Sequence, residues 1–496
     1  MMKIILNQLK IIGALSVLFF PGCNPPDKLV SMPDLDEVIP VPGLSKAATP
    51  AAAPVPGTYT SAQNVALLCA TDGAAIHYTT GGSTPTSSSP LYDSPINITQ
   101  TTTLKAIAVK NGMSNSDVMT AVYTIISDGS VILHTRWPFM TGAAAPTGAF
   151  TAGNGQYPLL RHFNVLVAEN DMKPQSIMPG SKPAVFPGAY NWTNADKLVN
   201  YAKANNTEVR GHVLVWHSQT PDYLFDVSGG TTTMTKDTLY DRMEKHIKTV
   251  FEKYRGDVGW WDVCNEVVGD NGQIRPAGSP SGGGSWYTKV MENSGLTGTD
   301  RYEFVLKAFL WARQYADANS GTNVKLYLTD YNIEYGGAKQ TEFENLINYL
   351  ITNNAPIDGV GFQCHIKWDW PSVTEISNTI DKFAAKTRND GIKLMTQVTE
   401  LDMSLFSYNS EDTGKVTTLA DAVRDSRLAT QAAKYRQLFD MFKQKYDAGK
   451  LDMVLLWGIA DGHSWLNNHP VSGRTDYPLL FDRQYKPKEA YQKLVQ

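Results

Sequence analysis

From residue 131 onward, apolar segments of this chain repeatedly end in polar or aromatic side chains. Each segment is rich in Val, Ile, Leu or Phe, and its end carries a carboxylate, an amide, an amine, an imidazole or an indole. The side chains in these positions are Glu169, Asn170, Lys173, His212, Trp216, His217, Asn265, Glu266, Asp330, Asn332, Gln363, His365, Glu400, Asp402, Trp457 and Trp465. Any single one of them could be a hydrogen-bonded structural residue. As a set they indicate a functional site, because burying so many unpaired polar groups costs too much free energy to serve packing alone.

The chemistry that these residue types suit is hydrolysis of a glycosidic bond. Such hydrolysis uses two carboxylates on separate elements. The apolar faces of sugar rings pack on indoles, while Asn, Gln, His and Lys reach the sugar hydroxyls. The sequence has no HExxH or CxxC motif and no GxxxxGK[ST] phosphate loop. We therefore expect a glycan substrate, no cofactor and no metal.

The segments that carry these residues alternate with amphipathic stretches, which is typical of repeated βα units. One such stretch, 239–254, places its apolar residues on a single helical face. The candidate strands are 163–170, 209–217, 259–267, 324–332, 359–366, 393–402 and 453–461, with ILHT near residue 132 as an eighth. This pattern predicts an α/β fold, a (β/α)8 TIM barrel in residues 128–496, which gathers the strand ends at one mouth.

Residues 47–127 differ sharply in composition, with abundant Ser and Thr and few charges. Short alternating stretches at 65–70, 75–80, 104–110 and 121–125 are separated by turn residues, which predicts a small all-β sandwich. This region resembles modules related to the chitobiase C-terminal domain, with IHYTT, STP and LKAIAV in that order. All 11 Trp lie at or after residue 137, so we interpret the module as a spacer, with glycan binding as the alternative.

The N-terminus carries Lys3 and Lys10, then an apolar run over 11–20, and then Gly22 and Cys23. The run is too short to span a bilayer stably. Residues 1–22 resemble a bacterial lipoprotein signal peptide, which would make Cys23 the lipidated first residue, with ordinary secretion as the alternative. The Pro-rich residues 23–46 predict an extended tether. We expect an exported protein that is anchored by lipid at the cell surface or in the periplasm.

The charge balance bears on the partners of the protein. The 44 Lys and Arg against 48 Asp and Glu give a net charge of -4, which supplies no basic field for a phosphate backbone. We expect no nucleic-acid partner, no membrane contact other than the lipid at Cys23, and a monomer.

Residues from about 130 to 496 resemble glycoside hydrolase family 10, the retaining endo-β-1,4-xylanases built on a (β/α)8 barrel. The matching segments are FNVLVAENDMK, RGHVLVWHSQTP, WDVCNEV, LYLTDYN, DGVGFQCHI, TELD, WGIADGHSWL and PLLFDRQYKPK, in the order of the family. The resemblance implies that Glu266 is the general acid/base and Glu400 the nucleophile. In these roles Glu266 must hold a proton near neutral pH while Glu400 stays ionised.

The resemblance also assigns supporting roles. It implies that His365 and Asp402 hold the nucleophile in a hydrogen-bond network, and that Asn265 binds the 2-hydroxyl of the sugar being cleaved. The remaining substrate-binding positions are Glu169, Asn170, Lys173, His212, Trp216, Gln363, Trp457 and Trp465. Two residues depart from the family pattern: Pro174 stands where Trp is usual, and Thr329 where Asn is usual. The role of the Gly/Ser-rich stretch near 278–285 cannot be inferred from the sequence.

Two other functions stay open at this point. The barrel could hydrolyse another β-1,4-glycan such as a glucan, although Trp465 resembles the indole that crowds the hydroxymethyl group of a hexose and so favours a pentose. Alternatively, the protein could be a non-catalytic, glycan-binding surface lipoprotein. The presence of both Glu266 and Glu400 argues against that second alternative.

Overall fold

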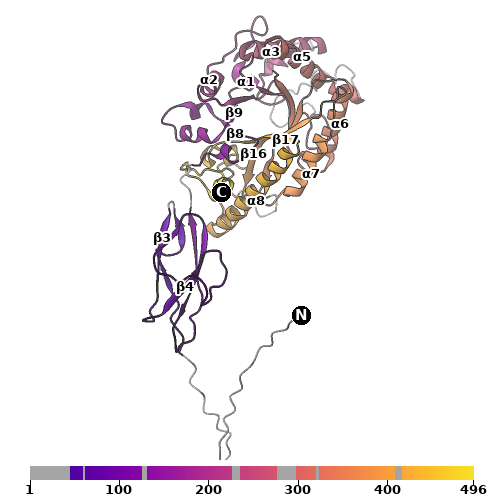
Figure 1. Ribbon diagram of the computed structural model, residues 1–496. Helices are drawn as coiled ribbons and strands as arrows, with labels where there is room; N and C mark the ends of the chain where they lie inside the picture. The colour runs from indigo at the N-terminus through magenta and orange to yellow at the C-terminus, as the bar shows by residue number, and fades with distance from the viewer. Residues whose placement is uncertain are drawn as a thin grey trace, which may run out of the picture.

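The computed structural model describes residues 45–59, 62–125, 131–225, 235–275, 298–319, 323–407 and 416–496. The predicted signal peptide, Cys23, most of the predicted tether and the Gly/Ser-rich stretch lie outside these residues. The domain boundary predicted between 127 and 128 does so as well, and it stays a prediction. Figure 1 shows a small β-module next to a larger domain of strands ringed by helices.

The small module consists of two sheets that share one core. One sheet has the order β1 (Ala51–Ala53), β3 (Gln63–Leu68), β5 (Ile96–Ile98), and the other has the order β2 (Gly57–Tyr59), β7 (Met119–Ile125), β6 (Thr102–Val109), β4 (Ala75–Thr79). Val65 and Leu67 of the first sheet are buried in the same apolar cluster as Leu104 and Tyr123 of the second. The predicted all-β sandwich is confirmed, and the three strands that the sequence pattern missed have only three residues each.

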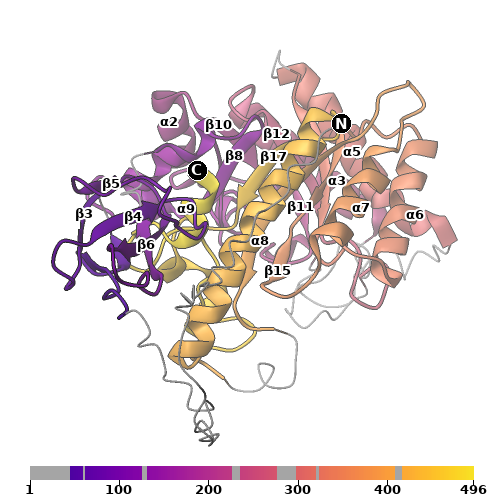
Figure 2. The ribbon, with the colours of Figure 1, turned by 60° about the horizontal axis from the view of Figure 1, so that its bottom comes forward.

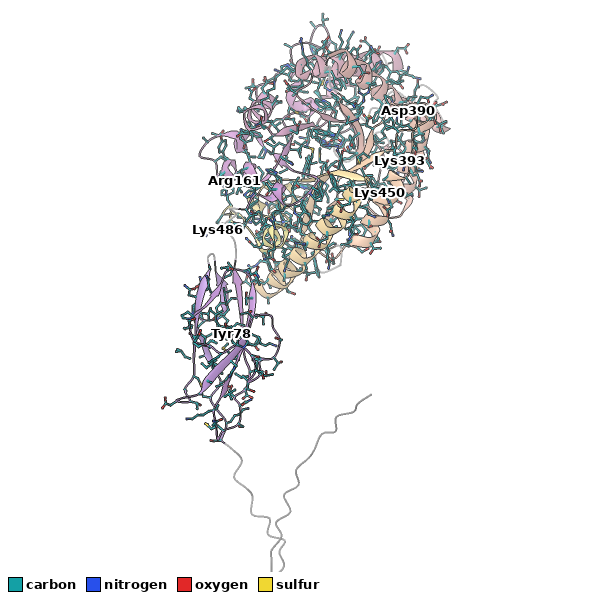
Figure 3. The ribbon with its side chains drawn as sticks, in the orientation of Figure 1. Tyr78, Arg161, Asp390, Lys393, Lys450 and Lys486 are labelled. Atoms are coloured by element: carbon teal, nitrogen blue, oxygen red, sulfur yellow. The ribbon has the colours of Figure 1, made fainter. Side chains whose placement is uncertain are left out.

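Several aromatic side chains of this module, Tyr123 among them, contribute to its core. Tyr78, labelled in Figure 3, and Tyr92 are partly buried against the apolar cluster. This packing is consistent with the interpretation of the module as a spacer, since flat sugar-binding sheets present their aromatic faces to solvent.

The large domain is a closed barrel of eight parallel strands. They are β8 (Met140–Ala145), β9 (Val165–Ala168), β10 (Glu208–Gly211), β12 (Trp260–Asn265), β13 (Lys325–Asp330), β14 (Gly359–Phe362), β16 (Met395–Ser404) and β17 (Leu451–Leu456). Each strand pairs in parallel with its neighbour, and the pairing of β17 with β8 completes the ring. The predicted (β/α)8 TIM barrel is confirmed.

Helices cover the outside of the barrel (Figure 1). They are α2 (Ala195–Asn205), α3 (Lys236–Tyr254), α5 (Glu303–Asn319), α6 (Ala338–Thr352), α7 (Val373–Ala384) and α8 (Asp421–Asp447). Every residue of the apolar face predicted within 239–254 is buried in α3, and α8 lies along the outer side of β17 (Figure 2). None of the described helices is both long enough and apolar enough to cross a membrane.

The sequence pattern was wrong about the first barrel strand. ILHT contributes to a short 3-10 turn, Leu133–Thr135, and the strand is β8, with the sequence MTGAAA. Small residues are required there, because a Cβ atom on Gly142 would lie 2.6 Å from Val165 Cγ1 on the neighbouring strand. Close packing therefore decides the composition of β8, and this removes the β-branched pattern by which strands are recognised.

The two faces of the barrel have different roles. Lys393 lies two residues before β16 and Lys450 directly before β17, so these two side chains, labelled in Figure 3, mark the face at which the strands begin. Lys450 bonds there to Asp381 of α7 at 2.8 Å. The carboxyl ends of the strands open on the opposite face, where a TIM barrel carries its active site.

Two predicted strands are each broken in two at this mouth. Segment 209–217 forms β10 and β11 (Val215–Trp216), and segment 359–366 forms β14 and β15 (His365–Lys367). The short strand β15 pairs with β16 so that His365 lies opposite Asp402. His365 therefore begins a strand of its own, whereas the sequence placed it at the end of the preceding one.

Candidate active site

A cleft of about 900 Å³ opens at the carboxyl ends of the barrel strands. Every residue of the barrel predicted to be catalytic, nucleophile-supporting or substrate-binding lines it. These are Glu169, Asn170, Lys173, His212, Trp216, Asn265, Glu266, Gln363, His365, Glu400, Asp402, Trp457 and Trp465. Among the described residues, no group of three or more His, Cys, Asp and Glu side chains is arranged to hold a metal ion.

Glu400 lies within β16 and is held by a chain of polar contacts. His365 Nε2 lies 3.2 Å from Glu400 Oε2, and its Nδ1 lies 3.0 Å from Asp402 Oδ2. Trp465 Nε1 donates a hydrogen bond of 2.8 Å to the same Asp402 oxygen. The second oxygen, Glu400 Oε1, is buried and makes no hydrogen bond within the described structure. One carboxylate oxygen is thus fixed by the protein, and the other is available to a reacting atom.

The ring of His365 is positively charged at neutral pH. Burial alone would lower its pKa, but Asp402 and Glu400 favour the imidazolium and raise the pKa to about 10. The charged ring joins two carboxylates that would otherwise repel each other.

We expect the His365 ring to keep both protons at pH values well above 6.5 and to lose one near pH 10. Because the folded pKa is raised, the stabilisation that this group provides is complete below 6.5 and disappears as the pH rises through about 10. Imidazole ¹⁵N shifts in histidine-labelled protein measure this titration. His246 is the internal contrast, since burial lowers its pKa to about 4 and it should stay neutral. A His365 ring that titrates near 6.5 would contradict the expected ion pairs.

Glu266 directly follows β12 on the other side of the reacting centre. Its Oε1 accepts hydrogen bonds from Gln363 Nε2 at 3.0 Å and from Asn265 Nδ2 at 3.4 Å. Its Oε2 lies 3.8 Å from both His217 Nε2 and Arg275 Nη2. Amide, imidazole and guanidinium donors therefore surround this carboxylate.

The ionisation of Glu266 differs from the sequence-based expectation. Burial raises the pKa of its carboxyl, but the His217 ring, the Gln363 amide and the Arg275 guanidinium stabilise the anion and hold the pKa below its ordinary value. Burial also lowers the pKa of His217 to about 4, so the positive charge of that ring is present only in acid. These contacts favour the ionised form of Glu266, whereas the sequence-based expectation requires a proton on it near neutral pH.

The amide of Asn265 is oriented by two donors. Thr329 Oγ1 donates to Asn265 Oδ1 at 2.8 Å, and Gln363 Nε2 lies 3.1 Å from the same oxygen. With its oxygen engaged, the amide turns its nitrogen toward Glu266. Thr329, which departs from the family pattern, thus fixes a residue of the cleft.

Lys173 organises one end of the cleft. Its Nζ donates to Asn170 Oδ1 at 3.0 Å and to Gln219 Oε1 at 2.8 Å, and it lies 4.8 Å from the centre of the Trp216 ring. Pro174 begins the short helix α1 (Pro174–Ile177), a position that suits proline. The departure at Pro174 therefore leaves Lys173 anchored in the cleft.

Indoles and imidazoles form the wall beside these groups. His212 Nδ1 bonds Asp262 Oδ2 at 2.9 Å, and its ring lies 5.4 Å from that of Trp457. The rings of His365 and Trp465 are 4.9 Å apart. The cleft thus combines aromatic faces with polar groups, as a sugar-binding site requires.

The sequence pattern missed several lining residues and misplaced one other. Gln219, Asp270, Arg275, Tyr331, Lys367 and His469 also line the cleft. All of them except Lys367, which ends β15, lie in the loops beyond the strands, where no periodic pattern indicates a direction. Asp330, which the pattern assigned to the mouth, is fully buried behind it, with Lys339 Nζ at 3.0 Å and the Val268 amide at 3.1 Å.

Comparisons with known proteins agree with this geometry. Residues 135–496 match glycosyl hydrolase family 10, and residues 54–120 match the chitobiase/beta-hexosaminidase C-terminal domain. Endo-1,4-beta-xylanase C of Paenibacillus barcinonensis is 40% identical over 338 residues, which are 68% of this chain and 28% of that protein. Endo-1,4-beta-xylanase A of Halalkalibacterium halodurans is 38% identical over 351 residues, which are 68% of this chain and 79% of that protein.

A solved structure shares the architecture. The structure of GH10 from Paenibacillus barcinonensis has a TM-score of 0.64 and 37% identity, and the match covers 74% of this chain and 97% of that one. The family match extends over more than half of the chain and includes every residue of the cleft. The chain belongs to glycosyl hydrolase family 10.

Proposed function

We propose that this protein is an endo-β-1,4-xylanase that hydrolyses internal bonds of xylan with retention of the anomeric configuration. The observation that carries the proposal is the pairing in one cleft of Glu266 and Glu400, which come from different strands and have different partners. One carboxylate is surrounded by amides and a guanidinium, and the other is fixed by an imidazolium. Two carboxyl groups with separate roles are what a double displacement requires.

In the first step, the unbonded oxygen of Glu400 attacks the anomeric carbon while Glu266 protonates the leaving oxygen. The charged His365 ring holds one oxygen of Glu400 and so aims the carboxylate. The Asn265 amide, oriented by Thr329 and Gln363, is placed to bond the sugar 2-hydroxyl, a contact that strengthens as charge develops on the ring.

In the second step, Glu266 accepts a proton from water, which attacks the glycosyl ester at Glu400. The contacts of Glu266 favour this step, because they hold its pKa low and leave it ionised to act as the base.

The choice of xylan rests on Trp465 and on the relatives. The names of both curated relatives above state endo-1,4-beta-xylanase activity. Trp465 lines the cleft and is fixed through its Nε1 to Asp402, so its indole cannot easily withdraw from an additional hydroxymethyl group.

The test is the anomeric configuration of the first products from linear xylan, followed by ¹H NMR during the first minutes. We expect short xylo-oligosaccharides with newly formed β-anomeric ends. Products with α-anomeric ends would contradict the role of Glu400. Equal rates on carboxymethyl cellulose would assign the cleft to another β-1,4-glycan, and binding without any products would indicate a glycan-capturing protein.

We also propose that the chain is exported and anchored by lipid at Cys23, on the pattern of residues 1–23. Detergent phase separation of cells that express the full chain tests this anchor. We expect the protein in the detergent phase, and a Cys23→Ser variant in the aqueous phase or retained as an uncleaved precursor. Equal partition of both variants into the aqueous phase would favour ordinary secretion.

A further inference from the structure

The backbone at Glu266 has an unusual conformation. Its φ angle is +53°, in the left-handed region that residues with a Cβ atom rarely adopt. Such a conformation persists only where neighbouring groups hold it in place, and it is most often found at functional sites. The contacts of the Glu266 main chain therefore identify the residues that aim its side chain.

Two hydrogen bonds hold this segment of main chain. The Glu266 amide donates to the Thr329 carbonyl at 2.9 Å, which ties it to the neighbouring strand. The Glu266 carbonyl accepts a bond of 2.6 Å from Arg275 Nε. The first contact is between backbones, so only the second depends on a side chain.

Arg275 is itself placed by the loop that returns after Glu266. Its amide donates to the Val267 carbonyl at 3.0 Å, and a β-bridge joins Val268 to Ile274. Its Nη2 donates to the Tyr331 hydroxyl at 2.7 Å and lies 3.8 Å from Glu266 Oε2. One planar guanidinium thus contacts the Glu266 carbonyl and also stands beside its carboxyl group.

We propose that Arg275 is a positioning residue for the acid/base, through two separable actions. Nε holds the left-handed backbone that aims Glu266, and the positive charge favours the ionised carboxyl group. The inference rests on the proposed function, since it concerns the acid and base steps of that reaction.

Other charges around Glu266 remain when that of Arg275 is removed. Lys173, which lines the cleft, and Lys339, which is buried beside Asp330, contribute positive charge, and His217 contributes only when it is protonated. The buried Asp330 opposes them. Asp270 and Tyr331 bond to each other at 2.9 Å beside the guanidinium, and Glu400 lies in the same cleft. Of the charged groups in the described part of the chain named here, it is Arg275 that also bonds to the Glu266 main chain.

The test compares Arg275→Met and Arg275→Lys with the full-length protein. The substrates are a 2,4-dinitrophenyl β-xylobioside, whose leaving group needs no proton, and an unactivated xylo-oligosaccharide. For Arg275→Met we expect kcat/KM on the oligosaccharide to fall by about 10-fold to 100-fold, with little change on the activated substrate. The alkaline limb of its pH profile should move upward by about one pH unit, because a neighbouring cation has been lost.

Arg275→Lys separates the two actions. This variant keeps the positive charge but loses the planar Nε donor. We therefore expect kcat/KM on the oligosaccharide to fall as it does in Arg275→Met, while the alkaline limb of the pH profile stays at its wild-type position. Arg313→Met is the matched control, because Arg313 pairs with Asp358 at 2.8 Å, outside the residues that line the cleft. We expect this control to behave as the wild type on both substrates.

The outcomes distinguish the two proposals. The positioning role would be overturned if kcat/KM fell equally on both substrates in both Arg275 variants and the alkaline limb of the pH profile did not move. The proposed xylanase activity would not be affected by that result. If Arg275→Met fails to fold, Arg275→Lys with wild-type kinetics on the oligosaccharide would overturn the backbone action. A wild-type protein that cleaves neither substrate would overturn the proposed function and this inference with it.

Discussion

Replacing Glu400 with Ala should lower kcat on xylan by about 10⁴-fold or more while the fold is preserved. The variant loses Glu400 Oε1, the oxygen that makes no hydrogen bond within the described structure, and the nearby carboxylate of Asp402 is already engaged by His365 and Trp465. His365 keeps Asp402 as a partner, so the ring stays anchored. Steady-state kinetics on xylan and thermal unfolding of both proteins measure the two parts of the prediction.

Azide identifies the role that has been lost. In Glu400→Ala, the small anion can enter the space left by the carboxylate and attack an aryl β-xyloside once, which gives an α-glycosyl azide. Glu244→Ala is the matched control, because Glu244 accepts a hydrogen bond from the Tyr315 hydroxyl at 2.7 Å outside the cleft lining. If azide restored the activity of Glu400→Ala with a β-glycosyl azide as the product, or if the variant were fully active without azide, Glu400 would not be the nucleophile.

Most of the site could be predicted because its residues stand at the ends of apolar strand segments, which can be identified in the sequence. In parallel strands, the residue after the last apolar position must face the mouth of the barrel. Glu169, Asn265 and Trp457 follow this rule, and the structure brings them into one cleft. Asp330 follows the same pattern but is buried behind the cleft, since the side chain of Lys339 satisfies it there. The direction of a single side chain depends on partners that are distant in sequence.

The remaining features depend on packing and loop geometry, which carry no periodic signal. Strand β8 is made of small residues because β9 passes close to Gly142. Arg275 lies ten residues beyond the end of β12, and only the turn that returns the chain to Val267 brings its guanidinium to Glu266. The pKa of Glu266 is lowered by the His217 ring, by Gln363 and by the guanidinium that this return places, so its ionisation could not be inferred from its place in WDVCNE.

Replacing Glu266 with Ala should affect substrates according to their leaving groups. On xylan, whose leaving alcohol needs a proton, we expect kcat/KM to fall by about 10²-fold to 10⁴-fold. On a 2,4-dinitrophenyl β-xylobioside, kcat/KM should be largely preserved, because it reports formation of the glycosyl ester at Glu400 without assistance from an acid. In that variant kcat should fall on both substrates, since no base remains to activate water for the second step.

The pH profile and azide complete this test of Glu266. Its loss should remove the alkaline limb of kcat/KM, and azide should restore kcat on the activated substrate by attacking the glycosyl ester, which gives a β-glycosyl azide after two displacements. Glu266→Gln is the control for shape, because it keeps an acceptor for Gln363 Nε2 at the position of Oε1 but cannot exchange a proton. Equal losses of kcat/KM on xylan and on the activated substrate would contradict the acid/base assignment. The configuration of the two azides, α from Glu400→Ala and β from Glu266→Ala, assigns each carboxylate to one half of the reaction independently of any rate.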